Sequence, residues 1–183
     1  MRLSENRAIA WLVFAACVVF SLSFSSGRAL SNLRADNERV FFSGTVQSMG
    51  LSIDKHLSTR AGCAYNIASV AGNYPIDKAL TANAKDAADQ LSRAGTIEEK
   101  NAANLACERA VQDLYTAIDN AALSATDRNY ALSQYRDFQA AGDLIRHDKY
   151  NEYATDFNQE LSAFPARLLA NMTGVKPLTL FSS

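Results

Sequence analysis

The side chains that could carry acid, base or metal chemistry are few, and their spacing does not assemble them into a site. His56 and His147 are the only histidines. Asp143 and His147 lie four residues apart, on one face of a helix, but two ligands are fewer than a zinc or di-iron site needs. A solvated surface pair explains them better, and we expect no metal or other cofactor.

Nucleophilic catalysis would need a serine, cysteine or threonine beside a base, and no GxSxG, HExxH or GxxxxGK[ST] pattern frames one. Glu98 and Glu99 are adjacent, but neighbours on a helix diverge by about 100°, so they suit a helix start better than paired acid–base catalysis. Cys63 and Cys107 are expected to be packed thiols, with a disulfide left open for an extracytoplasmic domain. We therefore expect no catalytic activity.

The charge balance argues against a polyanionic partner. The 183 residues carry 18 basic and 19 acidic side chains, a formal net charge of −1. Because no basic stripe runs along the chain, we expect no nucleic-acid binding.

Residues 8–27 (AIAWLVFAACVVFSLSFSSG) carry no charge. A helix of about 20 residues spans about 30 Å, the thickness of the bilayer's hydrocarbon core. We expect a short tail at 1–7 and a single retained transmembrane anchor at 8–27. The serines at its end leave a cleaved signal peptide as an alternative, and a buried helix of a soluble core is a third.

The charges that flank this run are nearly balanced, so they constrain its orientation weakly. Arg2 and Arg7 precede it, and Arg28, Arg34 and Arg39 follow it. A short, positively charged tail tends to stay in the cytoplasm. This rule favours a cell-membrane protein with its bulk outside the cytoplasm.

The rest of the chain, 28–183, reads as one all-α domain. Helical periodicity runs from 28 to 74 with interruptions at Gly44 and Gly50, from 75 to 94, and from a capping box at Thr96 and Glu99 to 123. In the first of these, small residues form a seam for a neighbouring helix: Leu57, Ala61, Ala64, Ala68 and Ala71.

A fourth helix is expected from 128 to 164, capped by Asp127 and kinked or restarted at Pro165. Tyr150, Phe157 and Phe164 recur every seven residues as a bundle seam. Asn151 and Asn158 lie one heptad apart beside it, and Tyr153 adds a hydroxyl. Either these polar groups fix helix register or they form a ligand site. Gly174 should end a last short helix before an apolar tail that packs back on the bundle.

The C-terminal block, 150–181, resembles the most recognisable block of the bacterial LemA family. The shared features are Tyr150-Asn151, Asn158, Phe164-Pro165, Leu169-Ala170, Gly174 and a terminal aromatic near a proline. Arg60, Ala61, Asn66 and Tyr74 also match, and the similarity extends over 51–181. The chain departs from the pattern at 62–65, where Gly-Cys-Ala-Tyr replaces the usual Asp-Leu-Ile-Pro, which marks a divergent member.

The resemblance implies an elongated antiparallel four-helix-type bundle behind an N-terminal transmembrane helix, and it brings no catalytic residues. It also implies a small N-terminus outside the cell, which is the opposite of the orientation that the flanking charges favour. The candidate interaction or register residues are Arg60, Asn66, Tyr150, Asn151, Tyr153, Asn158, Phe164 and Pro165.

We expect a membrane-anchored interaction or scaffold module of the bacterial envelope, with the membrane and other envelope proteins as partners. A lipid- or small-molecule-binding bundle is the alternative, which requires a pocket near Tyr150, Tyr153 and Asn158. An envelope hydrolase is a third, which requires His56 or His147 beside a nucleophile.

Overall fold

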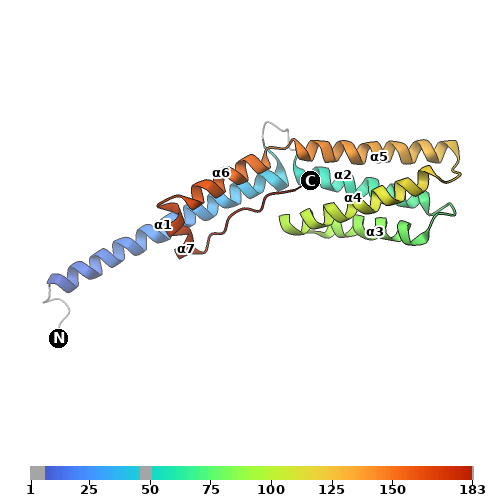
Figure 1. Cartoon of the computed structure of the whole chain (residues 1–183). Helices are drawn as coiled ribbons and strands as arrows, with labels where there is room; N and C mark the ends of the chain where they lie inside the picture. Colours follow the sequence, from blue (N-terminus) through green and yellow to red (C-terminus); the bar gives the residue numbers. More distant parts are fainter. Residues whose placement is uncertain (1–6, 46–50, 183) are drawn as a thin grey trace. The chain divides into compact units, whose positions relative to one another are not determined.

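The computed structural model describes residues 7–45 and 51–182, except for the side chains of 7–10, 12 and 15–24. This part of the chain contains helices and no strands, which confirms the all-α prediction (Figure 1). The helices are α1 (Arg7–Ser43), α2 (Ile53–Ala71), α3 (Lys78–Arg93), α4 (Ile97–Asp119), α5 (Ala125–Arg146), α6 (Tyr150–Ser162) and α7 (Ala166–Thr173).

The uncharged run at 8–27 belongs to the long helix α1. Within the part of the chain that the structure describes, no helix combines the length and the apolar character that crossing a membrane requires. The transmembrane helix expected from the sequence is therefore not supported. Residues 1–6 of the expected N-terminal tail lie outside the described residues.

The described residues group into two compact units. Unit 1 combines those of Met1–Glu38 with Glu152–Leu178, and unit 2 combines Arg39–Asn151 with Thr179–Ser183. Helices α1 and α6 contribute to both units. The single domain at 28–183 stays a prediction.

Unit 2 contains a helical bundle centred on α2, which contacts α3, α4 and α5. The short links between consecutive helices make neighbours antiparallel, as expected for a four-helix-type bundle. The small residues predicted as the seam of α2 are all buried, and they let the neighbouring helices approach closely. Opposite them, the apolar core includes Leu91 of α3, Val111, Leu114 and Ile118 of α4, and Phe138 of α5.

Local hydrogen bonds explain where most of these helices begin and end. The predicted capping box of α4 is confirmed: Thr96 Oγ1 accepts from the Glu99 amide, and the Glu99 carboxylate accepts from the Thr96 amide. The hydrogen bond that the Gly95 amide donates to the Glu99 carboxylate lowers the pKa of Glu99, and the bonds with Thr96 lower it further. The prediction that Pro75 opens the next helix is wrong, because Asp77 caps α3 by accepting from the Ala79 amide.

Two further predictions of helix boundaries are wrong. Ser124, not Asp127, caps α5, and its hydroxyl accepts from the Asp127 amide. The long fourth helix is two helices, because α5 ends at Arg146 and α6 begins at Tyr150. The carboxylate of Asp148 accepts from the Tyr150 amide at 2.8 Å and so satisfies a backbone donor at the start of α6.

Glycines mark helix ends as predicted at two places. Gly44 follows α1 and Gly174 follows α7, with positive φ angles of 70° and 74° that glycine adopts without a steric penalty. Gly50, the other predicted interruption, lies outside the described residues.

The capping box gives a direct stability test. We expect Thr96→Ala to lower the free energy of unfolding by about 1 kcal/mol, because the Glu99 amide loses its side-chain acceptor. Thr116→Ala is the matched control, since Thr116 is exposed in the same helix and bonds only to the carbonyl of Gln112. Urea denaturation measures both; equal losses would contradict the role of the cap.

Candidate functional site

Arg60 is the largest fully buried side chain, and it lies between three helices of unit 2. Its Nη1 donates to Asn104 Oδ1 of α4 at 2.5 Å, and its Nη2 lies 3.3 Å from Glu108 Oε2. The guanidinium carbon sits 4.1 Å from the centre of the Phe138 ring of α5. A cation at this depth is stable only when paired in this way. Arg60 was a sequence candidate, whereas the sequence analysis missed Asn104 and Glu108.

Two donors in this cluster, Arg60 Nε and Asn104 Nδ2, are buried without a hydrogen-bond partner among the described residues. A second buried cation, Lys100, pairs with Asp54 Oδ1 at 2.6 Å. Both buried cations therefore pair with carboxylates of the same unit, and these ion pairs stabilise the packing of its helices.

Cys63 and Cys107 are free and buried, as expected of packed thiols. Burial raises the pKa of Cys107 to about 11, and the nearby Arg60 only partly offsets this effect. Burial also raises the pKa of Cys63, with a smaller contribution from Asp137. Since the thiolate is the nucleophile, burial disfavours the reactive form of both groups.

Asn151 and Asn158 bind the backbone of the C-terminal tail. Asn151 Nδ2 donates to the Phe181 carbonyl at 2.7 Å, and its Oδ1 accepts from the Phe181 amide at 2.8 Å. Asn158 makes the same pair of bonds to Leu178, at 2.8 and 2.7 Å. Each amide side chain thus satisfies both backbone groups of one tail residue. We call these two asparagines the tail clamp.

The spacing of the tail clamp follows from backbone geometry. Seven residues of helix rise about 10.5 Å, and three residues of extended chain cover about 10 Å. Asparagines one heptad apart on α6 therefore match tail residues three apart. This match assigns them to binding the chain's own tail rather than a separate ligand.

Tyr150 and the end of the tail pack together within unit 2. The buried Tyr150 hydroxyl donates to the Thr179 carbonyl at 2.8 Å. Its ring and that of Phe181 both contact Phe41, at centroid distances of 5.2 and 5.4 Å. Asn101 accepts from the Ser182 amide. The predicted packing of the apolar tail is thus confirmed for Leu178 and Phe181, whereas Leu180 is exposed.

The other sequence candidates have more modest roles. Asn66 Nδ2 donates to Gln134 Oε1 at 2.8 Å, and Tyr153 is half-buried. Phe164 does not continue the seam, because α6 ends at Ser162 and the chain turns through Pro165 into α7. Phe164 and Pro165 are both exposed there, joined by a cis peptide bond.

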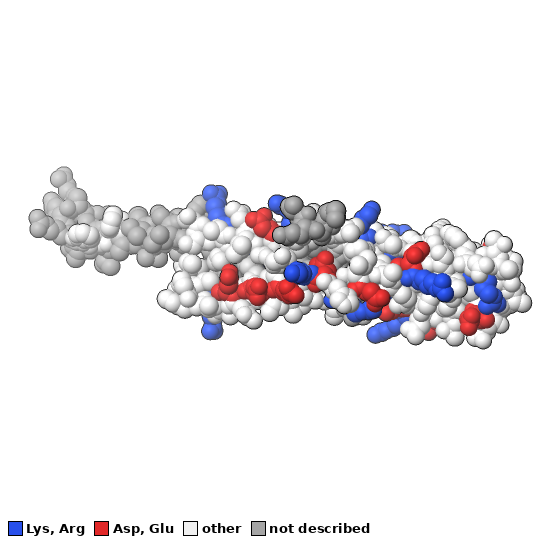
Figure 2. Space-filling view, turned by 90° about the horizontal axis from the view of Figure 1, so that it is seen from above, with Lys and Arg blue, Asp and Glu red and all other residues white. Residues whose placement is uncertain are grey.

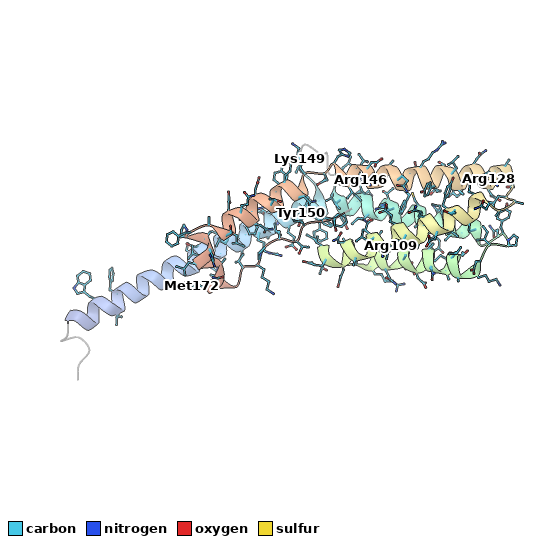
Figure 3. The ribbon with its side chains drawn as sticks, in the orientation of Figure 1. Arg109, Arg128, Arg146, Lys149, Tyr150 and Met172 are labelled. Atoms are coloured by element: carbon cyan, nitrogen blue, oxygen red, sulfur yellow. The ribbon has the colours of Figure 1, made fainter. Side chains whose placement is uncertain are left out.

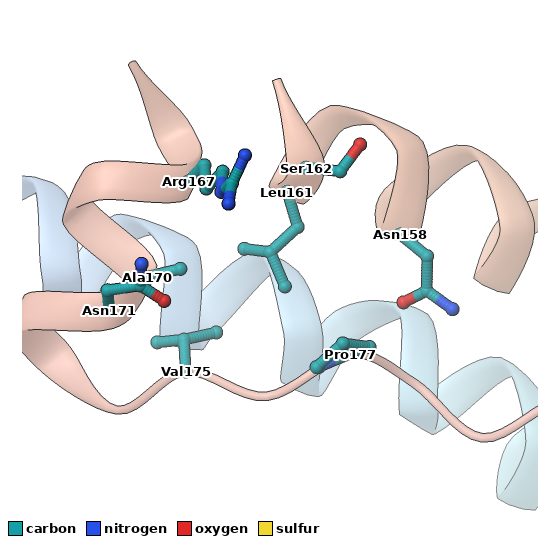
Figure 4. Close-up of a pocket in the computed structure, with 8 residues that line it drawn as sticks. All are labelled: Asn158, Leu161, Ser162, Arg167, Ala170, Asn171, Val175 and Pro177. Atoms are coloured by element: carbon teal, nitrogen blue, oxygen red, sulfur yellow. The ribbon is translucent and has the colours of Figure 1, made fainter. Parts of the chain in front are cut away.

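A hollow of about 250 Å³ opens in unit 1, and Figure 4 shows its lining. The lining combines amides, one cation and apolar groups: Asn158, Leu161, Ser162, Arg167, Ala170, Asn171, Val175 and Pro177. A pocket was expected near Tyr150 and Tyr153, but neither tyrosine lines this hollow, and Tyr150 is fully buried.

The Asp143 and His147 pair does not form a ligand set. Asp143 binds Arg146, and His147 Nδ1 lies 2.8 Å from the Asp143 carbonyl oxygen instead of its carboxylate. Within the described ranges, no group of three potential metal ligands occurs.

These features define an all-helical module whose buried polar groups serve its own packing. The model of the LemA family matches residues 51–183, and the chain belongs to the LemA family. Comparisons with the curated proteins and with the solved structures find no match.

The buried Arg60 cluster predicts a large loss of stability on substitution. Arg60→Met removes the cation and leaves Asn104 and Glu108 without their partner, so we expect unfolding to require about 3 kcal/mol less. Arg109→Met is the control, because Arg109 is exposed on the same helix as Glu108 (Figure 3). It should change stability by less than about 0.5 kcal/mol. Similar losses in the two variants would refute the role of the cluster.

The tail clamp predicts a local effect. Asn158→Ala removes both side-chain bonds to Leu178, and we expect the Leu178 amide to exchange hydrogen roughly fivefold faster, equivalent to about 1 kcal/mol. Hydrogen exchange read by mass spectrometry measures this. Gln159→Ala, at the exposed neighbouring position, is the control and should leave the exchange of the Leu178 amide unchanged. Unchanged exchange in Asn158→Ala would contradict the role of Asn158 in holding the tail.

Proposed function

We propose that the protein is a membrane-attached helical module of the bacterial envelope that works by binding rather than by catalysis. Its N-terminal run at 8–27 enters the lipid, and its helical units present a surface to other envelope components. Family membership supports the helical module, and the sequence of the run supports the attachment.

The observation that carries the attachment is the exposure of large apolar side chains on α1. Trp11, Val13 and Phe14 are 67%, 55% and 59% exposed, and they lie within an uncharged run of 20 residues. Apolar surface of this kind is unfavourable in water, and burial in hydrocarbon removes the cost. Trp11 is also near the start of the run, where membrane proteins favour an aromatic side chain.

The state of the described cations and thiols favours binding in this proposal. The buried cations Arg60 and Lys100 are paired, and the two described thiols stay protonated at neutral pH. Charges of both signs are interspersed over the face seen in Figure 2, and Tyr65, Tyr130 and Leu144 are exposed on unit 2. Exposed aromatic and apolar side chains among mixed charges suit contacts with protein partners.

A ligand-binding bundle is the second candidate, favoured by the hollow of about 250 Å³ in unit 1. This hollow is smaller than the pockets that enclose drug-sized ligands, about 300 to 1,000 Å³, and the amide of Asn158 at its wall is already used by Leu178. A second hollow of unit 1, about 420 Å³, is large enough, but its Arg34 already binds Glu38 and the Lys176 carbonyl. We therefore place the binding module first.

Attachment can be tested by washing membranes at alkaline pH. The natural chain should stay in the membrane pellet, whereas Val13→Arg with Val18→Arg should be released, because each charge costs about 3 kcal/mol in a membrane helix. Ser133→Arg with Ala140→Arg adds the same charges on exposed positions of α5 and should stay in the pellet. Release of the natural chain would refute the attachment.

Intact cells that carry Ser133→Cys report the side of the membrane on which the bundle lies. Ser133 is exposed, whereas Cys63 and Cys107 are buried, so a membrane-impermeant thiol reagent should label the new cysteine. Labelling of intact cells supports a bundle outside the cytoplasm. Labelling only after lysis would reverse this orientation.

A further inference from the structure

One side of α7 exposes apolar side chains that the rest of the structure leaves uncovered. Phe164, in the turn before α7, is 86% exposed, and Leu168 and Met172 are 56% and 57% exposed. Leu168 and Met172 are four residues apart and share one side of the helix, opposite the buried Ala170. We call these three side chains the α7 apolar edge; Met172 is labelled in Figure 3.

The C-terminal end of α7 packs against Gly27, within unit 1. A Cβ atom at Gly27 would lie 2.3 Å from Thr173 Cγ2, so this approach requires glycine. Gly27 is the last residue of the uncharged run. If the run spans the hydrocarbon of a bilayer, its last residue lies at the boundary with the headgroups, and α7 lies there with it.

The charges near this contact favour an anionic surface. Four basic side chains lie in the stretches that adjoin this contact: Arg28, Arg34, Arg167 and Lys176. Arg34 also pairs with Glu38 at 2.7 Å. The second hollow of unit 1, about 420 Å³, is lined by Ser31, Arg34, Thr173, Gly174, Val175 and Lys176. Within it, Arg34 Nε donates to the carbonyl of Lys176, the third residue after α7, at 3.0 Å, which ties the start of the tail to α1.

We propose that α7 lies in the interface of the membrane, with its apolar edge among the upper acyl chains and the nearby cations at anionic phospholipid headgroups. Interfacial helices combine these two features, an apolar side and basic flanks. The inference rests on the proposed attachment of the run at 8–27. A lipid surface is favoured over a second copy of the chain because the edge adjoins the end of that run.

Tryptophan fluorescence tests this placement in the full chain. Trp11 is the only tryptophan, so Trp11→Phe with Leu168→Trp puts one reporter on the α7 apolar edge. A second variant uses Met172→Trp. The control is Trp11→Phe with Tyr65→Trp, at a half-exposed position of α2 in unit 2. Each chain is reconstituted in phosphatidylcholine and phosphatidylglycerol vesicles in which bromine is carried high or low on the acyl chains.

We expect strong quenching of the α7 reporters by bromine high on the chain, weaker quenching by bromine low on the chain, and none at Tyr65→Trp. The natural Trp11 reports attachment separately. If Trp11 is quenched and the α7 reporters are not, the attachment holds and the placement of α7 is wrong. Quenching of none of the reporters refutes both. An α7 reporter shielded from aqueous acrylamide but not quenched by bromine would show a protein contact and overturn the lipid assignment.

Discussion

The buried guanidinium of Arg60 constrains the whole of unit 2. A cation without water must be paired, so α4 has to present Asn104 and Glu108, which are four residues apart, on the side that faces α2. Helix α5 likewise has to place Phe138 over the guanidinium. Gly142, four residues on, borders the same guanidinium, and a Cβ there would make an ordinary contact of 3.6 Å with Arg60 Cζ. One side chain thereby fixes how two helices rotate about their axes.

The two asparagines of the tail clamp supply hydrogen-bond partners to an irregular segment, the residues after α7. The residues after α7 form no helix or strand, so their amides and carbonyls need partners from elsewhere. An asparagine amide offers one donor side and one acceptor side, which matches the backbone of a single residue. Asn151 and Asn158 use both sides, and this explains why asparagine rather than a charged side chain occupies these positions.

The sequence predicted the elements whose signals are local. The capping box at Thr96 and Glu99 and the glycine after α7 depend only on neighbouring residues, and both were found from the sequence. The break between α5 and α6 was missed, because apolar periodicity continues across it and a single carboxylate, Asp148, decides it. The partners of Arg60 and Asn158 could not be predicted from local sequence signals, because Asn104 and Leu178 are 44 and 20 residues away along the chain.

The near-neutral charge of the chain hides a segregation that bears on its role. The two stretches 6–35 and 161–181 hold five basic side chains without an acid, so the other residues hold 13 basic and all 19 acidic ones, a net charge of −6. If the run at 8–27 is attached to a bilayer as proposed, an anionic surface attracts these basic stretches and repels acidic side chains. The proposed attachment therefore draws on two kinds of observation, the exposed apolar side chains of α1 and α7 and the basic side chains beside α7. Their agreement matters because neither a lone exposed side chain nor a lone cation identifies a membrane contact.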